Sequence, residues 1–293
     1  MSGPRRERWL GFGPVKIGIS LPFAVDRRVF RSSSRPVAIA IPAEASEPLP
    51  ARRPAPSELD RADRPLRDRV GAVRWFDSID VGDGVVTPGV VDRRRHVEAY
   101  DIPPQLTGKR CLEVTAHDGF WSFEMERRHA SAVVSAGLPN GPDAAFAIAR
   151  EALGSSVARE RISVLDLSPE LTGTFDLVVV DGLLGVVRDP QRVLDRVRSV
   201  CRGSIRVIEA FDPSLEGYGE ACLAGYRRAH GGSWSMNVNT IAQMLRVAGF
   251  ARVTELARIF DAARSGRTEV VLGAEPDESE RMLEPSKRLI EIR

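Results

Sequence analysis

The sequence predicts an α/β fold in which helices cover both faces of a mainly parallel, doubly wound sheet of seven strands. Short, uninterrupted apolar runs, such as Leu177–Val180, are typical of strands that are buried on both faces. These runs alternate with segments of helical length and periodicity. The hydrophobic content of 43% and charged content of 28% over 293 residues are ordinary for a globular protein.

The order of the elements follows from these patterns and their punctuation. Pro190 suits the first turn of a helix, and Asn237 or Asn239 can cap another. The expected strands are Arg110–Val114, Ala132–Ser135, Arg161–Leu165, Phe175–Val180, Ser204–Ala210, Val253–Ile259 and Glu269–Leu272. The expected helices are Leu66–Trp75, Phe120–Arg128, Asp143–Leu153, Pro190–Val200 and Asn239–Ala248. Because no helix separates the last two strands, they predict a closing hairpin at one edge of the sheet.

A basic N-terminal extension precedes this domain. Residues 1–69 hold 14 Lys and Arg against 8 Asp and Glu, a formal charge of +6, which leaves −4 for the rest of a chain with a total of +2. We expect residues 1–65, rich in Pro and Arg, to be a partly disordered extension, with an arm that contacts a partner as the alternative. Pro36–Ile41 alternates weakly and could form an isolated strand. The domain is then 66–276, followed by a tail at 277–293.

Composition excludes several classes of function. No apolar run approaches the roughly 20 residues of a membrane span, and the N-terminus lacks a good signal-peptide pattern, so we expect a cytoplasmic protein. Three cysteines with no paired spacing argue against disulfides and against a metal site. The small net charge argues against a nucleic-acid partner.

Candidate site residues follow from the strand ends, because ligands of such sheets bind beyond the carboxyl ends of the strands. They are Glu113, Thr115, His117, Gly119, Gly137, Asp166, Leu167, Asp181 and Glu209. The loop from Glu113 to Gly119 lacks the G-x-G-x-x-G spacing that cradles a pyrophosphate. An adenosine cofactor without phosphates therefore fits this loop better than NAD does.

Three of these residues have two interpretations each. Asp166 can accept from an adenine amino group while Leu167 packs on the ring, or Asp166 is a plain turn aspartate. Asp181 ends the fourth strand, where a polar group often faces the reacting centre. His117 is a candidate base or substrate-orienting group, although a lone loop histidine is more often an ordinary surface residue. His117 and Asp181 are the catalytic candidates.

Several segments resemble one enzyme family. They are WFDSIDVGDGVVTPG, LTGKRCLEVTAHDGFWSFEMERRHA, AFAIAREALGSSV, TFDLVVVDGLL, VRDPQRVLDRVRSVCRG and WSMNVNTIAQMLRVAGF. In this order they resemble the class I S-adenosylmethionine-dependent methyltransferases, and more narrowly the branch related to the tRNA wobble-uridine carboxymethyl transferases. The resemblance covers Leu66 to Pro276. It implies a Rossmann-like, seven-stranded methyltransferase fold and S-adenosylmethionine as cofactor.

Three positions depart from the family pattern. Thr115 stands where the family has Gly, and Gly185–Val187 stands where the branch carries His. Gly137 replaces the Asp or Glu that accepts both ribose hydroxyls. Unmet hydroxyls cost on the order of 1–3 kcal/mol each, so the departures predict weakened or lost cofactor binding.

The resemblance implies a methyltransferase that acts on a small molecule. His117, Asp181, Glu209 and Tyr226 are the groups that we expect near the acceptor. Gly137 and Thr115 motivate an alternative, a non-methylating relative that serves as a pseudoenzyme or partner subunit. A tRNA-modifying enzyme is a second alternative, suggested by the branch and by the arginine-rich head. The sequence leaves the acceptor and the oligomeric state open.

Overall fold

The computed structural model describes residues 8–12, 15–19, 65–114, 117–137, 143–227, 232–261 and 267–277. Contacts divide the chain into two units, residues 1–55 and 56–293. In the first unit, β1 (Arg8–Phe12) pairs antiparallel with β2 (Val15–Ile19). The expected strand at Pro36–Ile41 and the tail after Asp277 lie outside the described residues.

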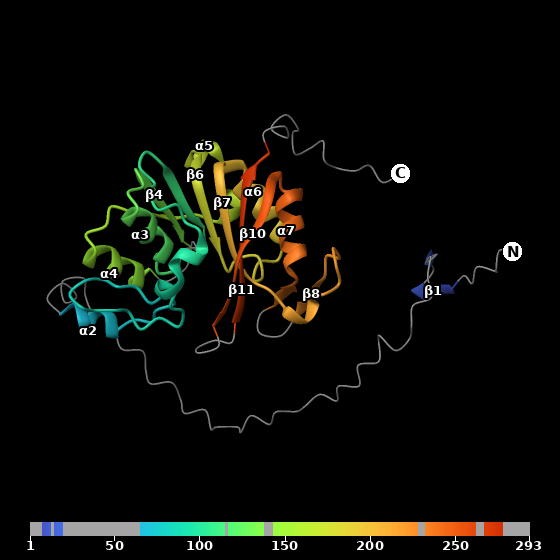
Figure 1. The fold of residues 1–293 in the computed structure, drawn as a ribbon, viewed down its shortest axis with the longest axis horizontal. Helices are drawn as coiled ribbons and strands as arrows, with labels where there is room; N and C mark the ends of the chain where they lie inside the picture. Colours follow the sequence, from blue (N-terminus) through green and yellow to red (C-terminus); the bar gives the residue numbers. More distant parts are fainter. Residues whose placement is uncertain are drawn as a thin grey trace, which may run out of the picture. The chain divides into compact units, whose positions relative to one another are not determined.

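The second unit contains the predicted seven-stranded, doubly wound sheet (Figure 1). Its strands are β3 (Arg110–Val114), β4 (Ala132–Gly137), β5 (Ala158–Arg161), β6 (Phe175–Asp181), β7 (Cys201–Ala210), β10 (Phe250–Asp261) and β11 (Arg267–Pro276). Their spatial order is β10-β11-β7-β6-β3-β4-β5. The first five in sequence are parallel, and β11 is antiparallel to both β7 and β10. The predicted closing hairpin is therefore confirmed.

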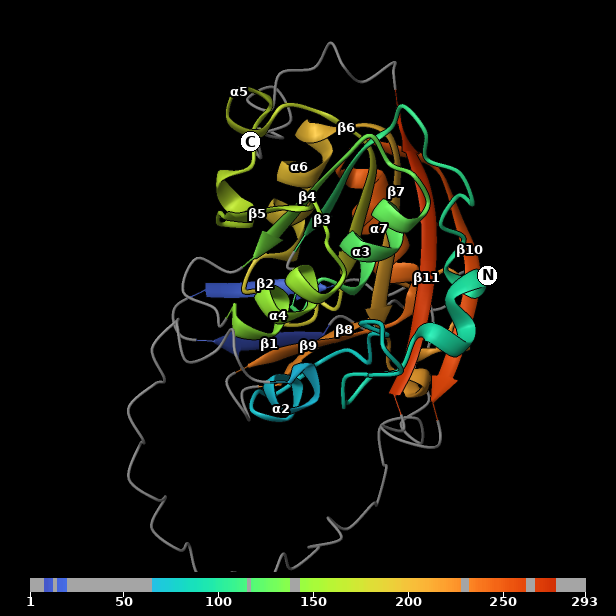
Figure 2. The ribbon, with the colours of Figure 1, turned by 90° about the vertical axis from the view of Figure 1, so that its left-hand side faces the viewer.

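Helices cover both faces of this sheet (Figures 1 and 2). They are α3 (Phe120–Arg127) and α4 (Ala144–Ala152) on one face, and α6 (Pro190–Val200) and α7 (Val238–Val247) on the other. Because strand side chains alternate between faces, Leu112 and Val178 pack with α6 and α7, whereas Cys111 and Leu177 pack with α3 and α4. The core thus lies in two layers around one central sheet.

Two predicted elements are misplaced or end early, and the last two strands, β10 and β11, extend beyond their predicted bounds. The third parallel strand is Ala158–Arg161, not Arg161–Leu165, because this edge strand tolerates the polar sequence ARER while the following apolar residues turn into the core. A short 3₁₀ helix at Val164–Asp166 and α5 (Pro169–Thr172) follow it. The first helix, α2 (Leu66–Gly71), also ends before the predicted Trp75.

Two segments outside the sheet pack at its carboxyl edge. Residues 75–100, which end in the 3₁₀ helix η1 (Arg94–Tyr100), reach the loop after β3, where the backbone N–H groups of Phe76 and Asp77 donate to Asp118. The hairpin of β8 (Ala224–Arg227) and β9 (Ser233–Met236) reaches the loop after β6. There Trp234 donates its backbone N–H to Gly185 O at 2.7 Å.

Candidate functional site

Glu113 lies at the carboxyl end of β3 and is 3% exposed. Its Oε2 accepts from the backbone N–H and the Oγ of Ser122, at 2.8 and 2.5 Å, and so ties the strand end to the first turn of α3. Burial raises the pKa of Glu113 to about 7, although the bonds from Ser122 oppose the shift. This carboxyl therefore titrates near neutral pH.

Gly119 begins α3 with a backbone φ of +90°, a conformation that residues with a Cβ rarely adopt. A Cβ at this position would lie 2.6 Å from Cδ2 of Phe146. The turn and the packing therefore both require glycine here. Thr115, the predicted departure within the same loop, lies outside the described residues.

The loop between Glu113 and Gly119 packs against residues 75–100. Asp118 accepts from the backbone N–H of Phe76 and, at 2.8 Å, from that of Asp77. The ring of Phe76 stacks on His117 with 4.2 Å between centroids. His117 remains exposed, and burial of part of its ring lowers its pKa.

Asp181, at the end of β6, has both carboxylate oxygens engaged. Trp121 Nε1 donates to Oδ2 at 2.9 Å, and Arg93 Nη2 lies 2.7 Å from Oδ2 and 3.0 Å from Oδ1. The Arg93 side chain is 1% exposed and also pairs with Asp77 and, at 3.9 Å, with Glu269. Burial lowers the pKa of Arg93, but attraction to Asp181 and Asp77 outweighs this and raises it. Asp181 thus anchors a buried ion-pair cluster.

Gly137, at the end of β4, faces a cation. A Cβ on Gly137 would lie 2.6 Å from both Cζ and Nη2 of Arg159, the second residue of β5. The side chain of Arg159 is 9% exposed and pairs with Asp143, the N-cap residue of α4, at 3.0 Å. The space beside the strand end is therefore occupied by a guanidinium.

The remaining candidates follow β5 or lie on β7 and β8. Asp166 is exposed on the 3₁₀ turn, and Leu167 is fully buried in the core beside α6. Glu209 is 2% exposed and accepts from the backbone N–H of Leu184 at 2.7 Å; burial raises its pKa to about 7. Tyr226 is 50% exposed on β8, with its ring 5.0 Å from that of Trp234.

The structure brings Glu113, His117, Gly119, Gly137, Asp181 and Glu209 to the carboxyl edge of the adjacent strands β4, β3, β6 and β7. Sequence reasoning missed Arg93, Trp121 and Arg159, which contact this edge through long side chains from other elements. The strand-like polar run Ala158–Arg161 was the available signal for Arg159, because a strand beside β4 directs side chains to the same edge.

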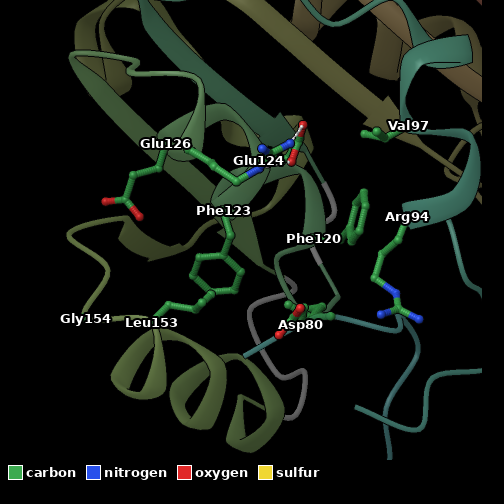
Figure 3. Close-up of a pocket in the computed structure, with 11 residues that line it drawn as sticks. Asp80, Arg94, Val97, Phe120, Phe123, Glu124, Glu126, Leu153 and Gly154 are labelled. Atoms are coloured by element: carbon green, nitrogen blue, oxygen red, sulfur yellow. Dashed lines mark hydrogen bonds and ion pairs between the residues drawn. The ribbon is translucent and has the colours of Figure 1, made fainter. Parts of the chain in front are cut away.

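A cavity of about 740 Å³ lies on the outer side of α3, away from these strand ends (Figure 3). The side chains of Phe120, Phe123 and Leu153 point into it, and Asp80 and Arg94 approach from the preceding segment. Its size suits a small molecule. Its lining includes none of the predicted site residues.

Comparison with solved structures identifies the fold. The N-terminal domain of EvdMO1, solved with S-adenosylhomocysteine (SAH) bound, matches with a TM-score of 0.53 and 18% identity over 72% of this chain and 95% of that one. The chain has the class I methyltransferase fold. The same domain solved in the presence of SAH and D-fucose matches with a TM-score of 0.53 and 17% identity over 77% of this chain and all of that one.

Comparisons by sequence give no relative. No family model matches the chain, and no curated protein matches it significantly. In the part of the chain that the structure describes, no group of three or more His, Cys, Asp or Glu side chains could hold a metal ion. No helix among the described residues has both the length and the apolar character needed to cross a bilayer.

Proposed function

We propose that the protein is an S-adenosylmethionine-dependent methyltransferase that acts on a small molecule. The observation that carries this proposal is the buried carboxylate of Glu113 at the end of β3, followed by the glycine turn that begins α3. In nucleotide-binding α/β sheets, the adenosine ligand lies against this loop and helix start. EvdMO1, whose N-terminal domain has the same fold, binds SAH.

The residues at the first loop fit such a cofactor, whereas the second strand end has an unusual donor set. Glu113 fixes the start of α3, and Gly119 gives the loop its turn. At the end of β4 the charged group is the Arg159 guanidinium rather than a carboxylate. Asp166 remains a proposed contact to the adenine and Thr115 to the methionine part, whereas the side chain of Leu167 is fully buried beside α6 and is not available to the ring.

S-adenosylmethionine, when bound, supplies a methyl group on a cationic sulfonium. The chain must then orient the acceptor and remove its proton. Glu209 is the candidate to hold this proton, because burial raises its pKa to about 7 and its partners are the neutral backbone N–H groups of Leu184 and Ala210 rather than a cation. Asp181 instead fixes residues 75–100 against the site, because Arg93 and Trp121 occupy its oxygens. His117, in the loop after β3, is a second candidate proton acceptor, because partial burial lowers its pKa.

Isothermal titration with S-adenosylmethionine and SAH tests the proposal. We expect both ligands to bind with one site per chain. Binding of SAH that competes with the methyl donor, together with SAH release in an assay of small-molecule acceptors, supports a methyltransferase. Absence of binding at millimolar ligand contradicts it.

The engagement of Asp181 favours a second candidate function, a non-methylating relative. A carboxylate that is already paired with Arg93 and Trp121 is unavailable as a base in this arrangement. Such a protein binds S-adenosylmethionine and SAH but does not transfer the methyl group. Turnover of the wild type separates the two functions, because only a methyltransferase converts S-adenosylmethionine to SAH. In a methyltransferase, Glu209→Gln should lower this turnover and leave SAH binding unchanged.

A further inference from the structure

The end of β4 carries the most informative departure from the pattern of this fold. In Rossmann-type sheets, a carboxylate about 20 residues after the first loop binds the ribose hydroxyls of an adenosine ligand. Gly137 holds this position and has no side chain. The Arg159 guanidinium fills the space instead, with Cζ and Nη2 at 2.6 Å and Nε at 2.8 Å from the place of a Cβ on Gly137.

The strand register explains how Arg159 reaches this place. Arg159 of β5 stands opposite Ser135 of β4, two residues before Gly137 and on the same face of the sheet. Its Nη1 donates to Ser135 Oγ at 2.8 Å. The guanidinium then lies over the Phe146 ring, with Cζ 4.5 Å from the centroid. A side chain on residue 137 would displace the guanidinium from this place, so the glycine and the arginine form a matched pair.

Arg159 joins three segments that surround the end of β4. Its Nε and Nη2 donate to Asp143 Oδ1 at 3.1 and 3.0 Å, and Nη2 also donates to the backbone oxygen of His117 at 3.2 Å. A guanidinium supplies donors and a carboxylate supplies acceptors, whereas a hydroxyl group can do both. An adjacent pair of hydroxyls can therefore accept from Arg159 and donate to Asp143.

We propose that Arg159, together with Asp143, binds the ribose hydroxyls of the cofactor in place of the usual strand-end carboxylate. This inference rests on the proposed function, because it needs an adenosine ligand at the site. It replaces the expectation of a bare ribose subsite beside Gly137. The single exchange Gly137→Asp should therefore not tighten binding of the cofactor, since the new carboxylate meets Arg159 before it meets a ligand.

Arg161 provides a matched control on the same strand. It also binds Asp143, with Nε 2.6 Å from Oδ2, but its side chain is 56% exposed. Neither Ser135 nor His117 is among its contacts in the described residues. If holding Asp143 were the whole role of the arginines, loss of either would have a similar effect.

The test is titration of SAH and its 2′-deoxyribose analogue into wild type, Arg159→Ala, Arg159→Lys and Arg161→Ala. The wild type should prefer SAH at least tenfold, as one charge-assisted hydrogen bond allows. Arg159→Ala should lose at least tenfold in affinity for SAH and also lose the preference. Arg161→Ala should keep both within about threefold. The double variant Gly137→Asp/Arg159→Ala should regain affinity, because it restores the usual carboxylate.

The outcomes separate the two proposals. If the wild type binds neither ligand, the proposed function fails and the ribose inference fails with it. If the wild type binds SAH and Arg159→Ala keeps its affinity and preference, the ribose inference alone is overturned. Thermal unfolding is recorded for every variant. If Arg159→Ala does not fold, Arg159→Lys decides: a loss of preference supports the inference, and an unchanged preference overturns it, since lysine lacks the planar fork.

Discussion

The ends of β3 and β4 lie side by side in the sheet, but the charged side chains at the two ends have opposite signs. At β3 a carboxylate, Glu113, is buried and held by Ser122 only nine residues later. At β4 a glycine, Gly137, leaves space for the guanidinium of Arg159 from the neighbouring strand. The first end is a local structure, and the second exists only once β5 has paired with β4.

This difference shows that the polar side chains at the end of a strand can come from segments other than the loop that follows it. The β3 end is closed by residues 75–100, whose Arg93 reaches Asp181 on the next strand. The β4 end is closed by Arg159 and Asp143. Both arginines are buried and paired, but only Arg93 faces several carboxylates and has a buried nitrogen, Nε, without a hydrogen-bond partner among the described residues.

Exchange of Arg93 for Met should have the largest effect on stability. It leaves Asp77 and Asp181 as buried charges without their cation, which typically costs about 3–5 kcal/mol of unfolding free energy. Chemical denaturation measures the loss. Arg252→Met is the control, because Arg252 pairs with Glu275 on the surface, where both side chains are more than half exposed, and its loss should cost less than about 1 kcal/mol. Equal effects of the two exchanges would show that the buried cluster does not support the β3 end.

Glu113→Gln should change the pH dependence of stability. The folded pKa of Glu113, about 7, lies above its ordinary value of 4.5, so the folded state binds the extra proton between these pH values. Its contribution is present below pH 4.5 and is lost as the pH rises through 7. The stability of the wild type relative to Glu113→Gln should therefore fall by on the order of 2–3 kcal/mol from pH 4.5 to 8. A flat difference curve from denaturation at several pH values contradicts the assignment.

Alanine at the two glycines compares the strand ends directly and should have the smallest effects. Gly119→Ala forces a positive φ and a contact with the Phe146 ring, at a cost of about 2 kcal/mol. Gly137→Ala meets the flexible end of Arg159, which can shift, so it should cost less than about 1 kcal/mol. Thermal unfolding orders the two variants. A larger loss for Gly137→Ala would mean that Arg159 is rigidly fixed.

Most of the fold could be predicted from the sequence, because the signals for strands and helices are local. The apolar run ending at Asp181 and the proline at position 190 placed β6 and α6 within one residue of their observed bounds. The third strand was misplaced because an edge strand can be polar, and Val164 and Leu165 pack beyond it. In such a case the hydrophobic pattern of the sequence places the strand on the apolar run that follows the true, polar strand.

The site was predicted where neighbours in sequence are neighbours in space, and missed elsewhere. Glu113 and Gly119 follow from one strand, one turn and one helix. Arg93 and Arg159 reach the edge through long side chains after distant segments have packed. The polar run Ala158–Arg161 was a signal for a strand beside β4, whereas no local pattern marks Arg93. The absence of a side chain at Gly137 was visible, but the group that fills its place depends on strand pairing.

A crystal structure of the protein with SAH bound tests the central claim most directly. We predict that the adenosine lies across the carboxyl ends of β3 and β4, with a ribose hydroxyl about 2.7–3.2 Å from a guanidinium nitrogen of Arg159. We also predict that Glu113 keeps its contact with Ser122. Density for SAH in the cavity beside Phe120 and Phe123, or a ribose held at the β4 end without Arg159, would contradict the account.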